Sequence, residues 1–217
     1  MEYATARDNM IDCQLRTNKV TEDRLLDAFA EVPRELFVPE ARRGFAYVDE
    51  DIAIGSGRHL MEPMVLARLL QAAAIEPGDV VLDVGAGTGY ASAIAARLAA
   101  TVVALESAEG LAAQANDRFQ ELGIDNAVVV TGPLTEGYAK QAPYNVILVN
   151  GAVASVPEVI AAQLAEGGRL VTVVKAGEGQ GKATLVQCIG GHPSSRVIFD
   201  AGTPRLAGFE PVAGFQF

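Results

Sequence analysis

Apolar positions in the first part of the chain recur at helical spacing. A first helix is predicted to begin after Thr21, a favourable N-cap residue, and to end at Pro33. A second helix is predicted from Pro63, because proline suits the first helical position. The segment 33–58 between them is expected to be irregular, since proline and glycine punctuate it. The apolar faces of the two helices are Leu25, Leu26, Phe29 and Val32 in the first, and Val65, Leu66, Leu69, Leu70 and Ala73 in the second.

From residue 79 onward, short runs of β-branched residues alternate with helical segments. Strands are predicted at 79–84, 101–106, 127–131, 144–149 and 169–175. Helices are predicted at about 90–99, 108–122 and 156–165. Two further runs, 182–189 and 195–200, indicate a terminal β-hairpin. This alternation predicts an α/β fold with a mostly parallel sheet and helices on both faces.

The change of pattern divides the chain into two expected parts. Residues 1–75 are predicted to form an N-terminal helical extension packed on the main domain. Residues 76–217 are predicted to form that domain, which would bind a ligand beyond the carboxyl ends of the strands.

Composition narrows the classes of protein that fit. The chain has 217 residues, half of them hydrophobic, and a net charge of −10, which indicates a globular protein and disfavours a nucleic-acid-backbone binder. The two cysteines, Cys13 and Cys188, and the two histidines, His59 and His192, are too few for a typical metal site or disulfide scaffold. No apolar run reaches the roughly 18 residues of a membrane span, and we see no secretory signal. We therefore expect a cytosolic protein, with its oligomeric state left open.

The strongest motif is a glycine loop, Asp83-Val84-Gly85-Ala86-Gly87-Thr88-Gly89, that joins the first predicted strand of the domain to its helix. Glycines at such a turn allow a ligand to approach the main chain. Glu106 ends the next predicted strand, where a carboxylate can accept hydrogen bonds from both ribose hydroxyls. The combination predicts a nucleoside cofactor.

The spacing of the loop favours one nucleoside over another. A dinucleotide site reads G-x-G-x-x-G, but Tyr90 stands here at the third glycine position. The anion Asp83 would repel a pyrophosphate and could help to hold a cationic amino-acid group. D-x-G-x-G-x-G is the pattern of S-adenosylmethionine methyltransferases, which leaves a nicotinamide dehydrogenase as the less favoured reading.

Beyond the loop, the sequence resembles the protein-L-isoaspartate O-methyltransferase family. The matching segments are MIDCQLR, VPRELFVPEARRGFAYVDEDIAIGSG, EPMVLARLL, VLDVGAGTGYASAIAARLA, LGIDNAVVV and QLAEGGRLV. The resemblance implies a Rossmann-like methyltransferase fold and methyl transfer from S-adenosylmethionine to an isoaspartyl carboxylate of a damaged protein. By matching positions, Asp83, Gly85, Gly87 and Glu106 would contact the cofactor, and Gly89 and Gly132 are further cofactor-binding candidates.

The chain departs from the family at the predicted acceptor site. The family pattern G-x-T-I-S-x-P reads here Gly57-Arg58-His59-Leu60-Met61-Glu62-Pro63, so Met61 replaces the active-site serine and His59 the threonine. Methionine has no hydrogen-bond donor for an acceptor carboxylate. The other departures are Gly132-Pro133-Leu134 in place of G-D-G, Asn145 in place of an aspartate, and Val173-Val174-Lys175 in place of P-V-G.

Several readings of these departures stay open. His59 either caps the helix that begins at Pro63 or is simply exposed, or acts in the cleft as an acid-base or substrate-binding group. Met61 is more typical of a packing residue than of a ligand, and Lys175 either is solvated or faces an anionic substrate. The acceptor is then an isoaspartyl protein or peptide, or an unknown small carboxylate. A cofactor-binding protein that no longer catalyses and acts through a partner is the alternative from another functional class.

Overall fold

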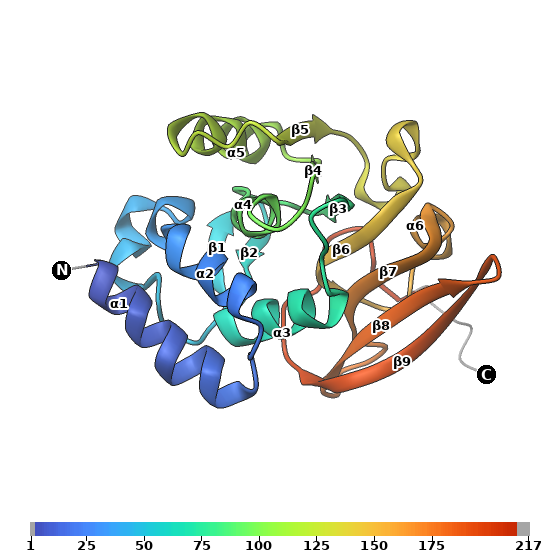
Figure 1. Ribbon diagram of the computed structural model, residues 1–217, viewed down its shortest axis with the longest axis horizontal. Helices are drawn as coiled ribbons and strands as arrows, with labels where there is room; N and C mark the ends of the chain where they lie inside the picture. Colours follow the sequence, from blue (N-terminus) through green and yellow to red (C-terminus); the bar gives the residue numbers. More distant parts are fainter. Residues whose placement is uncertain (1–2, 212–217) are drawn as a thin grey trace.

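A seven-stranded sheet forms the centre of the computed structural model, which describes residues 3–211 (Figure 1). Its strand order is β5-β4-β3-β6-β7-β8-β9. The first five strands in this order run parallel, whereas β8 pairs antiparallel with both β7 and β9. The mostly parallel α/β fold and the terminal hairpin are confirmed. The strands are β3 (Val80–Val84), β4 (Thr101–Glu106), β5 (Ala127–Thr131), β6 (Tyr144–Val153), β7 (Leu164–Val174), β8 (Gly181–Ile189) and β9 (His192–Ala201).

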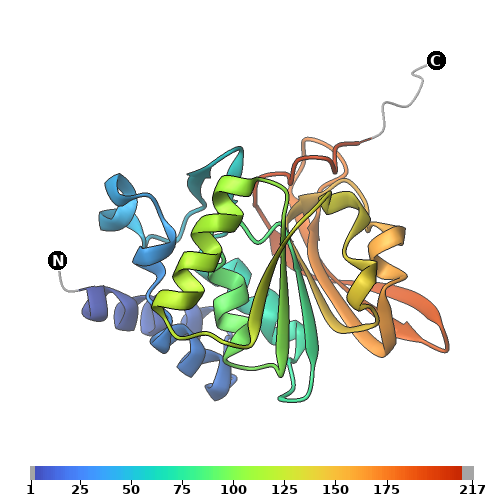
Figure 2. The same cartoon turned by 90° about the horizontal axis from the view of Figure 1, so that it is seen from above.

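Both faces of the sheet are covered, but by different kinds of element (Figure 2). Helices α3 (Pro63–Ala73), α4 (Tyr90–Ala96) and α5 (Glu109–Glu121) cover one face together with the N-terminal helices. The other face is covered by α6 (Glu158–Ala161), by the 3₁₀ turns Leu134–Glu136 and Ala139–Gln141, and by the C-terminal segment 203–209. The second layer is therefore largely irregular chain.

The N-terminal extension shares its apolar core with the sheet. It contains α1 (Tyr3–Met10), the helical turns Ile11–Leu15 and Arg16–Asn18, α2 (Asp23–Glu31), the 3₁₀ turns Arg34–Phe37 and Glu40–Phe45, and the antiparallel pair β1 (Ile52–Gly55) and β2 (Arg58–Leu60). Phe37 packs edge-on against Tyr90 of α4, and its carbonyl accepts a hydrogen bond from Thr88 in the glycine loop. Buried Arg34 lies over the same Tyr90 ring. The extension is thus fastened to the start of α4.

Several details differ from the sequence predictions, and β7 and β9 begin earlier than the predicted residues 169 and 195. Helix α2 begins at Asp23 with Glu22, not Thr21, at its N-cap position, and the Gln71 side chain accepts the main-chain N–H groups of Thr21 and Glu22 just before it. The helix predicted at 156–165 is only Glu158–Ala161, since the Gln163 side chain bonds to the 136–138 turn and β7 starts at Leu164. Segment 33–58, which was expected to be irregular, contains strand β1. Strand β6 continues beyond residue 149, where the prediction ended it.

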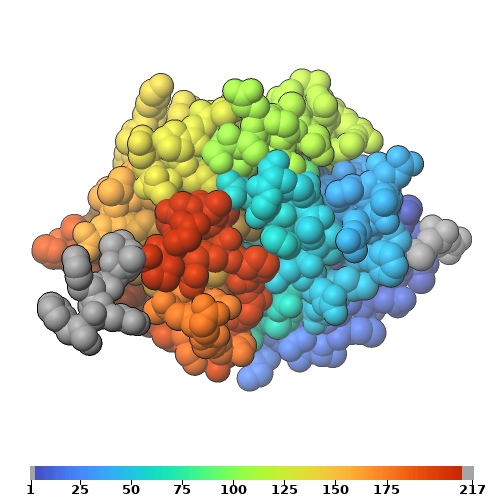
Figure 3. Space-filling model, turned by 180° about the vertical axis from the view of Figure 1, so that it is seen from behind, coloured from blue at the N-terminus to red at the C-terminus, as the bar shows by residue number. Residues whose placement is uncertain are grey.

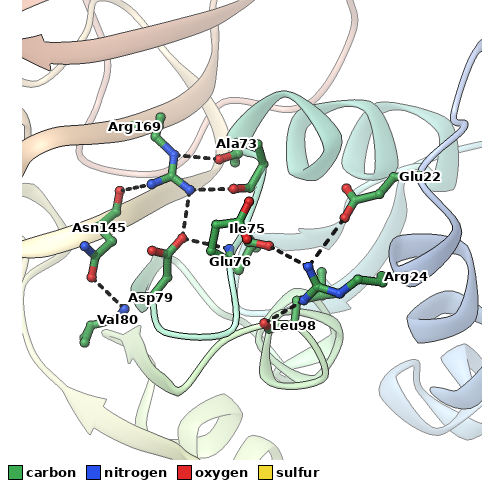
Figure 4. A network of polar contacts seen from close by, with 11 residues as sticks. Glu22, Arg24, Ala73, Ile75, Glu76, Asp79, Val80, Leu98, Asn145 and Arg169 are labelled. Atoms are coloured by element: carbon green, nitrogen blue, oxygen red, sulfur yellow. Dashed lines mark hydrogen bonds and ion pairs between the residues drawn. The ribbon is translucent and has the colours of Figure 1, made fainter.

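Polar side chains tie the amino ends of the strands together, far from the glycine loop (Figure 4). The Asn145 side chain accepts the main-chain N–H of Val80 and so joins β6 to β3. Arg169 donates to the carbonyl of Ala73 and to the carboxylate of Asp79. Asn145 therefore has a structural role at the end of the sheet opposite the predicted cofactor site.

Candidate functional site

The glycine loop lies at the point where the strand order changes direction. From β3 the chain proceeds to β4 and β5 on one side, and β6 then pairs with β3 on the other side. Gly85 and Gly87 adopt positive φ angles of 85° and 58°, which disfavour other residues. Ligands of open α/β sheets bind beyond the carboxyl ends of the strands at this switch point. The loop is therefore placed where the sequence predicted a cofactor.

Glu106, at the end of β4, is fully buried against this loop. Its carboxylate accepts the main-chain N–H of Gly87 at 2.9 Å and those of Ser107 and Ala108 at 2.7 and 2.9 Å. The guanidinium of Arg58 donates to both carboxylate oxygens at 3.1–3.3 Å. Although burial opposes ionisation, these hydrogen bonds together hold the pKa of Glu106 below its ordinary value. Glu106 is thus an ionised acceptor at the switch point.

Asp83 lies beneath the loop as the last but one residue of β3. One of its carboxylate oxygens accepts a hydrogen bond of 2.6 Å from Ser92, and the other has no partner among the described residues. Asn150 lies near the carboxyl and favours its ionised form without making a hydrogen bond of ordinary length. Burial, reinforced by the charge of Glu106, raises the pKa of Asp83 to about 7. An unpartnered buried carboxylate oxygen is suited to a cationic ligand group.

The C-terminal segment 203–209 crosses the switch point. Its main chain pairs with Ala152 near the end of β6 and with Ala154 just after it. The Leu206 side chain lies over Gly85 and Gly151, and a Cβ atom on Gly85 would be only 2.8 Å from Leu206 Cδ1. From behind, the red C-terminal segment meets the cyan segment that contains β1 and β2 (Figure 3). Between them is a hollow of about 10 Å³, lined in part by Arg58, His59, Asn150, Arg205 and Leu206.

The residues at the switch point suit the chemical groups of S-adenosylmethionine. Glu106 is an acceptor for a ribose diol, Asp83 has a free oxygen for an ammonium group, and Gly85 has no side chain to obstruct the ligand. Pockets for ligands of this size have volumes of roughly 300–1,000 Å³. The residues therefore fit the cofactor in their chemistry, although the hollow of about 10 Å³ is far smaller than such a pocket.

The remaining predicted site residues lie at different distances from this point. His59 is exposed on β2 and lines both the small hollow and a larger hollow of about 360 Å³ beside residues 42–53. It does not cap α3, because Glu62 occupies the N-cap position of that helix. Met61 is buried in the core, which agrees with a packing residue. Gly132 directly follows β5, and its N–H donates to the carbonyl of Glu106.

The other two candidates flank the site. Gly89 precedes α4, and its missing side chain allows Phe119 of α5 to pack closely. The main chain of Lys175 is held through its N–H by Val153 and through its carbonyl by Arg205.

Sequence reasoning did not single out Arg58, Leu206 or Arg205. Arg58 stood inside the divergent motif next to His59, and this position was the available signal. Leu206 and Arg205 had none, because they reach the site only through the crossing of segment 203–209. Within residues 3–211, no helix has the length and apolarity of a membrane span, and no group of three metal-ligating side chains is present.

Comparison with known proteins agrees with this geometry. A protein-L-isoaspartate O-methyltransferase from Koribacter versatilis is 44% identical over 176 residues, which are 81% of this chain and 79% of the relative. The enzyme of the same name from Roseiflexus castenholzii is 39% identical over 180 residues, 83% of this chain and 82% of the relative.

Solved structures show the same relationship. A protein-L-isoaspartate O-methyltransferase structure superposes with a TM-score of 0.81 at 25% identity over 94% of this chain and 67% of its own. A putative enzyme of this type from Plasmodium falciparum, solved in complex with S-adenosyl-L-homocysteine, shares the fold with a TM-score of 0.79 at 19% identity, over 95% of this chain and 98% of its own. The family profile described as protein-L-isoaspartate(D-aspartate) O-methyltransferase matches residues 5–192. With the glycine loop and Glu106 in place at the switch point, the chain belongs to the protein-L-isoaspartate(D-aspartate) O-methyltransferase family.

Proposed function

We propose that this protein transfers a methyl group from S-adenosylmethionine to the carboxylate of an isoaspartyl residue in a protein or peptide, through an acceptor site that differs from that of the family. The observation that carries the proposal is the ionised Glu106 carboxylate held against the glycine loop at the switch point. Asp83, Gly85, Gly87 and Gly132 complete the proposed cofactor site, with Gly89 fixing the packing of α5 behind it. The free cysteines Cys13 and Cys188 suit a reducing compartment, and we place the reaction in the cytosol.

The chemistry requires placement more than proton transfer. When bound, S-adenosylmethionine supplies a sulfonium methyl group that an acceptor carboxylate oxygen takes by displacement, the carbon–sulfur electron pair staying on sulfur, so that a methyl ester and a thioether form without transfer of a proton. A carboxylate with an ordinary pKa near 4 is already ionised at neutral pH. The protein must therefore align the acceptor oxygen and remove water from it.

The acceptor site is where this chain differs from its family. Met61 provides no donor, and its side chain is buried in the core. His59 stands exposed between the small hollow at the switch point and the larger hollow beside residues 42–53. We infer that the acceptor peptide lies over the larger hollow and passes its carboxylate beside His59.

The experiment is a methyl-transfer assay with radiolabelled S-adenosylmethionine. It compares an isoaspartyl peptide with the same peptide containing aspartate, and with small dicarboxylates. The proposal predicts label only in the isoaspartyl peptide, and loss of label in Gly85→Val, whose side chain would obstruct the loop. Label in a small dicarboxylate alone would contradict the proposed acceptor.

The closed switch point favours one alternative, a cofactor-binding protein that no longer catalyses. Arg58 covers Glu106 and Leu206 covers Gly85, so little space is left for a ligand. This alternative predicts that S-adenosyl-L-homocysteine binds in calorimetry while no acceptor is labelled. Binding of NAD in preference to S-adenosyl-L-homocysteine would instead support a dehydrogenase.

A further inference from the structure

Arg58 is held in a buried ion pair that the sequence motif does not explain. It is the first residue of β2 and is only 5% exposed. Its Nε and Nη2 atoms donate to the Glu106 carboxylate, and Nη2 also donates to the Ser107 hydroxyl at 2.9 Å. A planar guanidinium is suited to this two-point recognition of a carboxylate. Arg58 therefore has the geometry of a carboxylate-binding side chain, and the carboxylate that it binds here is that of Glu106.

The Glu106 carboxylate has no acceptor capacity left while Arg58 is bound. A carboxylate offers about four lone-pair sites. Here the main-chain N–H groups of Gly87, Ser107 and Ala108 use three of them, and the guanidinium covers both oxygens. Ribose hydroxyls can donate to Glu106 only after the guanidinium has left, whereas the main-chain donors can stay. Hydrogen bonds from ribose hydroxyls to Glu106 and the Arg58–Glu106 pair are thus mutually exclusive.

The hollow next to Arg58 is lined by side chains that can bind an anion. The hollow at the switch point is lined by Arg58, Arg205 and His59, and the charge of Arg58 is balanced by Glu106 as long as their ion pair is intact. The Arg205 Nη2 atom donates to the carbonyl of Lys175, whereas its Nε has no partner among the described residues. Met61 offers no donor in place of the family's serine. Arg58 is the cation that cofactor binding would release into this space.

We propose that Arg58 binds the acceptor carboxylate, and that it is stored on Glu106 until the cofactor's ribose hydroxyls replace it. This inference rests on the proposed function and names the group that replaces the lost serine donor. It makes binding ordered: the acceptor site is complete only when the cofactor is present. Coupling of this kind requires that one ligand change the state that the other ligand recognises.

The first arm of the test measures cofactor-product binding and needs no acceptor. Calorimetry with S-adenosyl-L-homocysteine compares wild type with Arg58→Gln and Arg58→Lys. Arg58→Gln has no ion pair to break. We therefore expect its affinity for S-adenosyl-L-homocysteine to rise by about tenfold, which is the effect expected if the paired form of wild type is populated about tenfold over the unpaired form. Arg58→Lys should fall between the two. A loss of affinity in Arg58→Gln would overturn the proposal, since it would mean that Arg58 only orients Glu106.

The second arm measures an isoaspartyl peptide by fluorescence anisotropy, with and without S-adenosyl-L-homocysteine. In wild type, the cofactor product should tighten peptide binding by about tenfold or more, within the usual range of such coupling. In Arg58→Gln this tightening should vanish, so that the peptide binds equally weakly with and without S-adenosyl-L-homocysteine. Arg205→Gln is the matched control, because it removes the other arginine that lines the hollow.

The outcomes separate the two ideas. Coupling that survives in Arg58→Gln and disappears in Arg205→Gln would overturn the role of Arg58 while leaving the proposed function intact. A wild type that binds no isoaspartyl peptide even with the cofactor product present would contradict the proposed acceptor and the acceptor role of Arg58 together. The calorimetry of the first arm would then decide by itself whether the cofactor displaces Arg58 from Glu106.

Discussion

Leu206 lies directly over Gly85 of the glycine loop. The two residues are far apart in the sequence, and they meet because segment 203–209 pairs with Ala152 across the switch point. Leu206 is buried in the core cluster of the second sheet face. The same side chain therefore stabilises the fold and covers the glycine loop.

Leu206→Ala should separate these two effects. Removing a buried leucine side chain typically costs about 2–5 kcal/mol of stability, so the melting temperature should fall by several degrees. Affinity for S-adenosyl-L-homocysteine should nevertheless rise, because the ligand no longer has to displace the leucine. Leu164→Ala, which truncates another leucine of the same cluster, is the control and should lower stability without tightening the ligand. Weaker binding in Leu206→Ala would show that Leu206 helps to form the site.

Replacement of Asp83 should make stability less dependent on pH. Burial raises its pKa to about 7 in the folded protein, whereas an unfolded aspartate has a pKa near 4. Between these values the folded state binds more protons than the unfolded state, so the contribution of Asp83 to stability falls as pH rises from about 4 to 7. Asp83→Asn stays neutral and should be more stable than wild type at pH 8, on the order of 1–3 kcal/mol, and lose this advantage near pH 4.

Two further observations complete the test of Asp83. Denaturation at several pH values measures the difference in stability between Asp83→Asn and wild type. Some dependence of stability on pH should remain because of Glu62: burial and the nearby charges of Asp51, Asp49 and Glu50 raise the pKa of Glu62 to about 7. Binding of S-adenosyl-L-homocysteine should weaken in Asp83→Asn, since the variant has no anion for the ammonium group. Unchanged affinity would remove Asp83 from the cofactor site.

Met61→Ser should cost stability without restoring full activity. Met61 is 2% exposed, and truncation of a buried methionine costs about 2–5 kcal/mol. We expect wild-type turnover on an isoaspartyl peptide to be well below that of a serine-bearing relative, since loss of one fixed donor costs about 10²–10³ in rate in oxyanion sites. Serine at position 61 should recover only part of this, because Pro133 and Val173-Val174-Lys175 also differ from the family. Turnover by wild type equal to that of the relative would refute a remodelled acceptor site.

The glycine loop and Glu106 were predictable because their signal is local. A strand, a turn that requires positive φ and a second strand ending in a carboxylate follow one another within the stretch 79–106. Hydrophobic runs predicted β3, β4 and β5 to within one residue, since the buried parallel strands β3 and β4 have continuous apolar sequence and the half-exposed edge strand β5 is a run of valines.

What the sequence could not show depends on contacts between distant segments. Arg58 lies 48 positions before Glu106, and no local pattern identifies such a buried pair. The short α6 reflects the bonds of Gln163 to the 136–138 turn, which compete with continued helix. The same holds for the start of α2, where Gln71 of α3 accepts the main-chain N–H groups of Thr21 and Glu22.

A crystal structure of the complex with S-adenosyl-L-homocysteine tests most directly the claim that the cofactor binds at the switch point after Arg58 and Leu206 have moved. The prediction is that the ribose hydroxyls lie on the Glu106 carboxylate, that the Arg58 guanidinium has left it for the space beside His59, and that Leu206 no longer covers Gly85. A complex in which the ligand is bound while the Arg58–Glu106 pair and the Leu206–Gly85 contact remain intact would contradict the account.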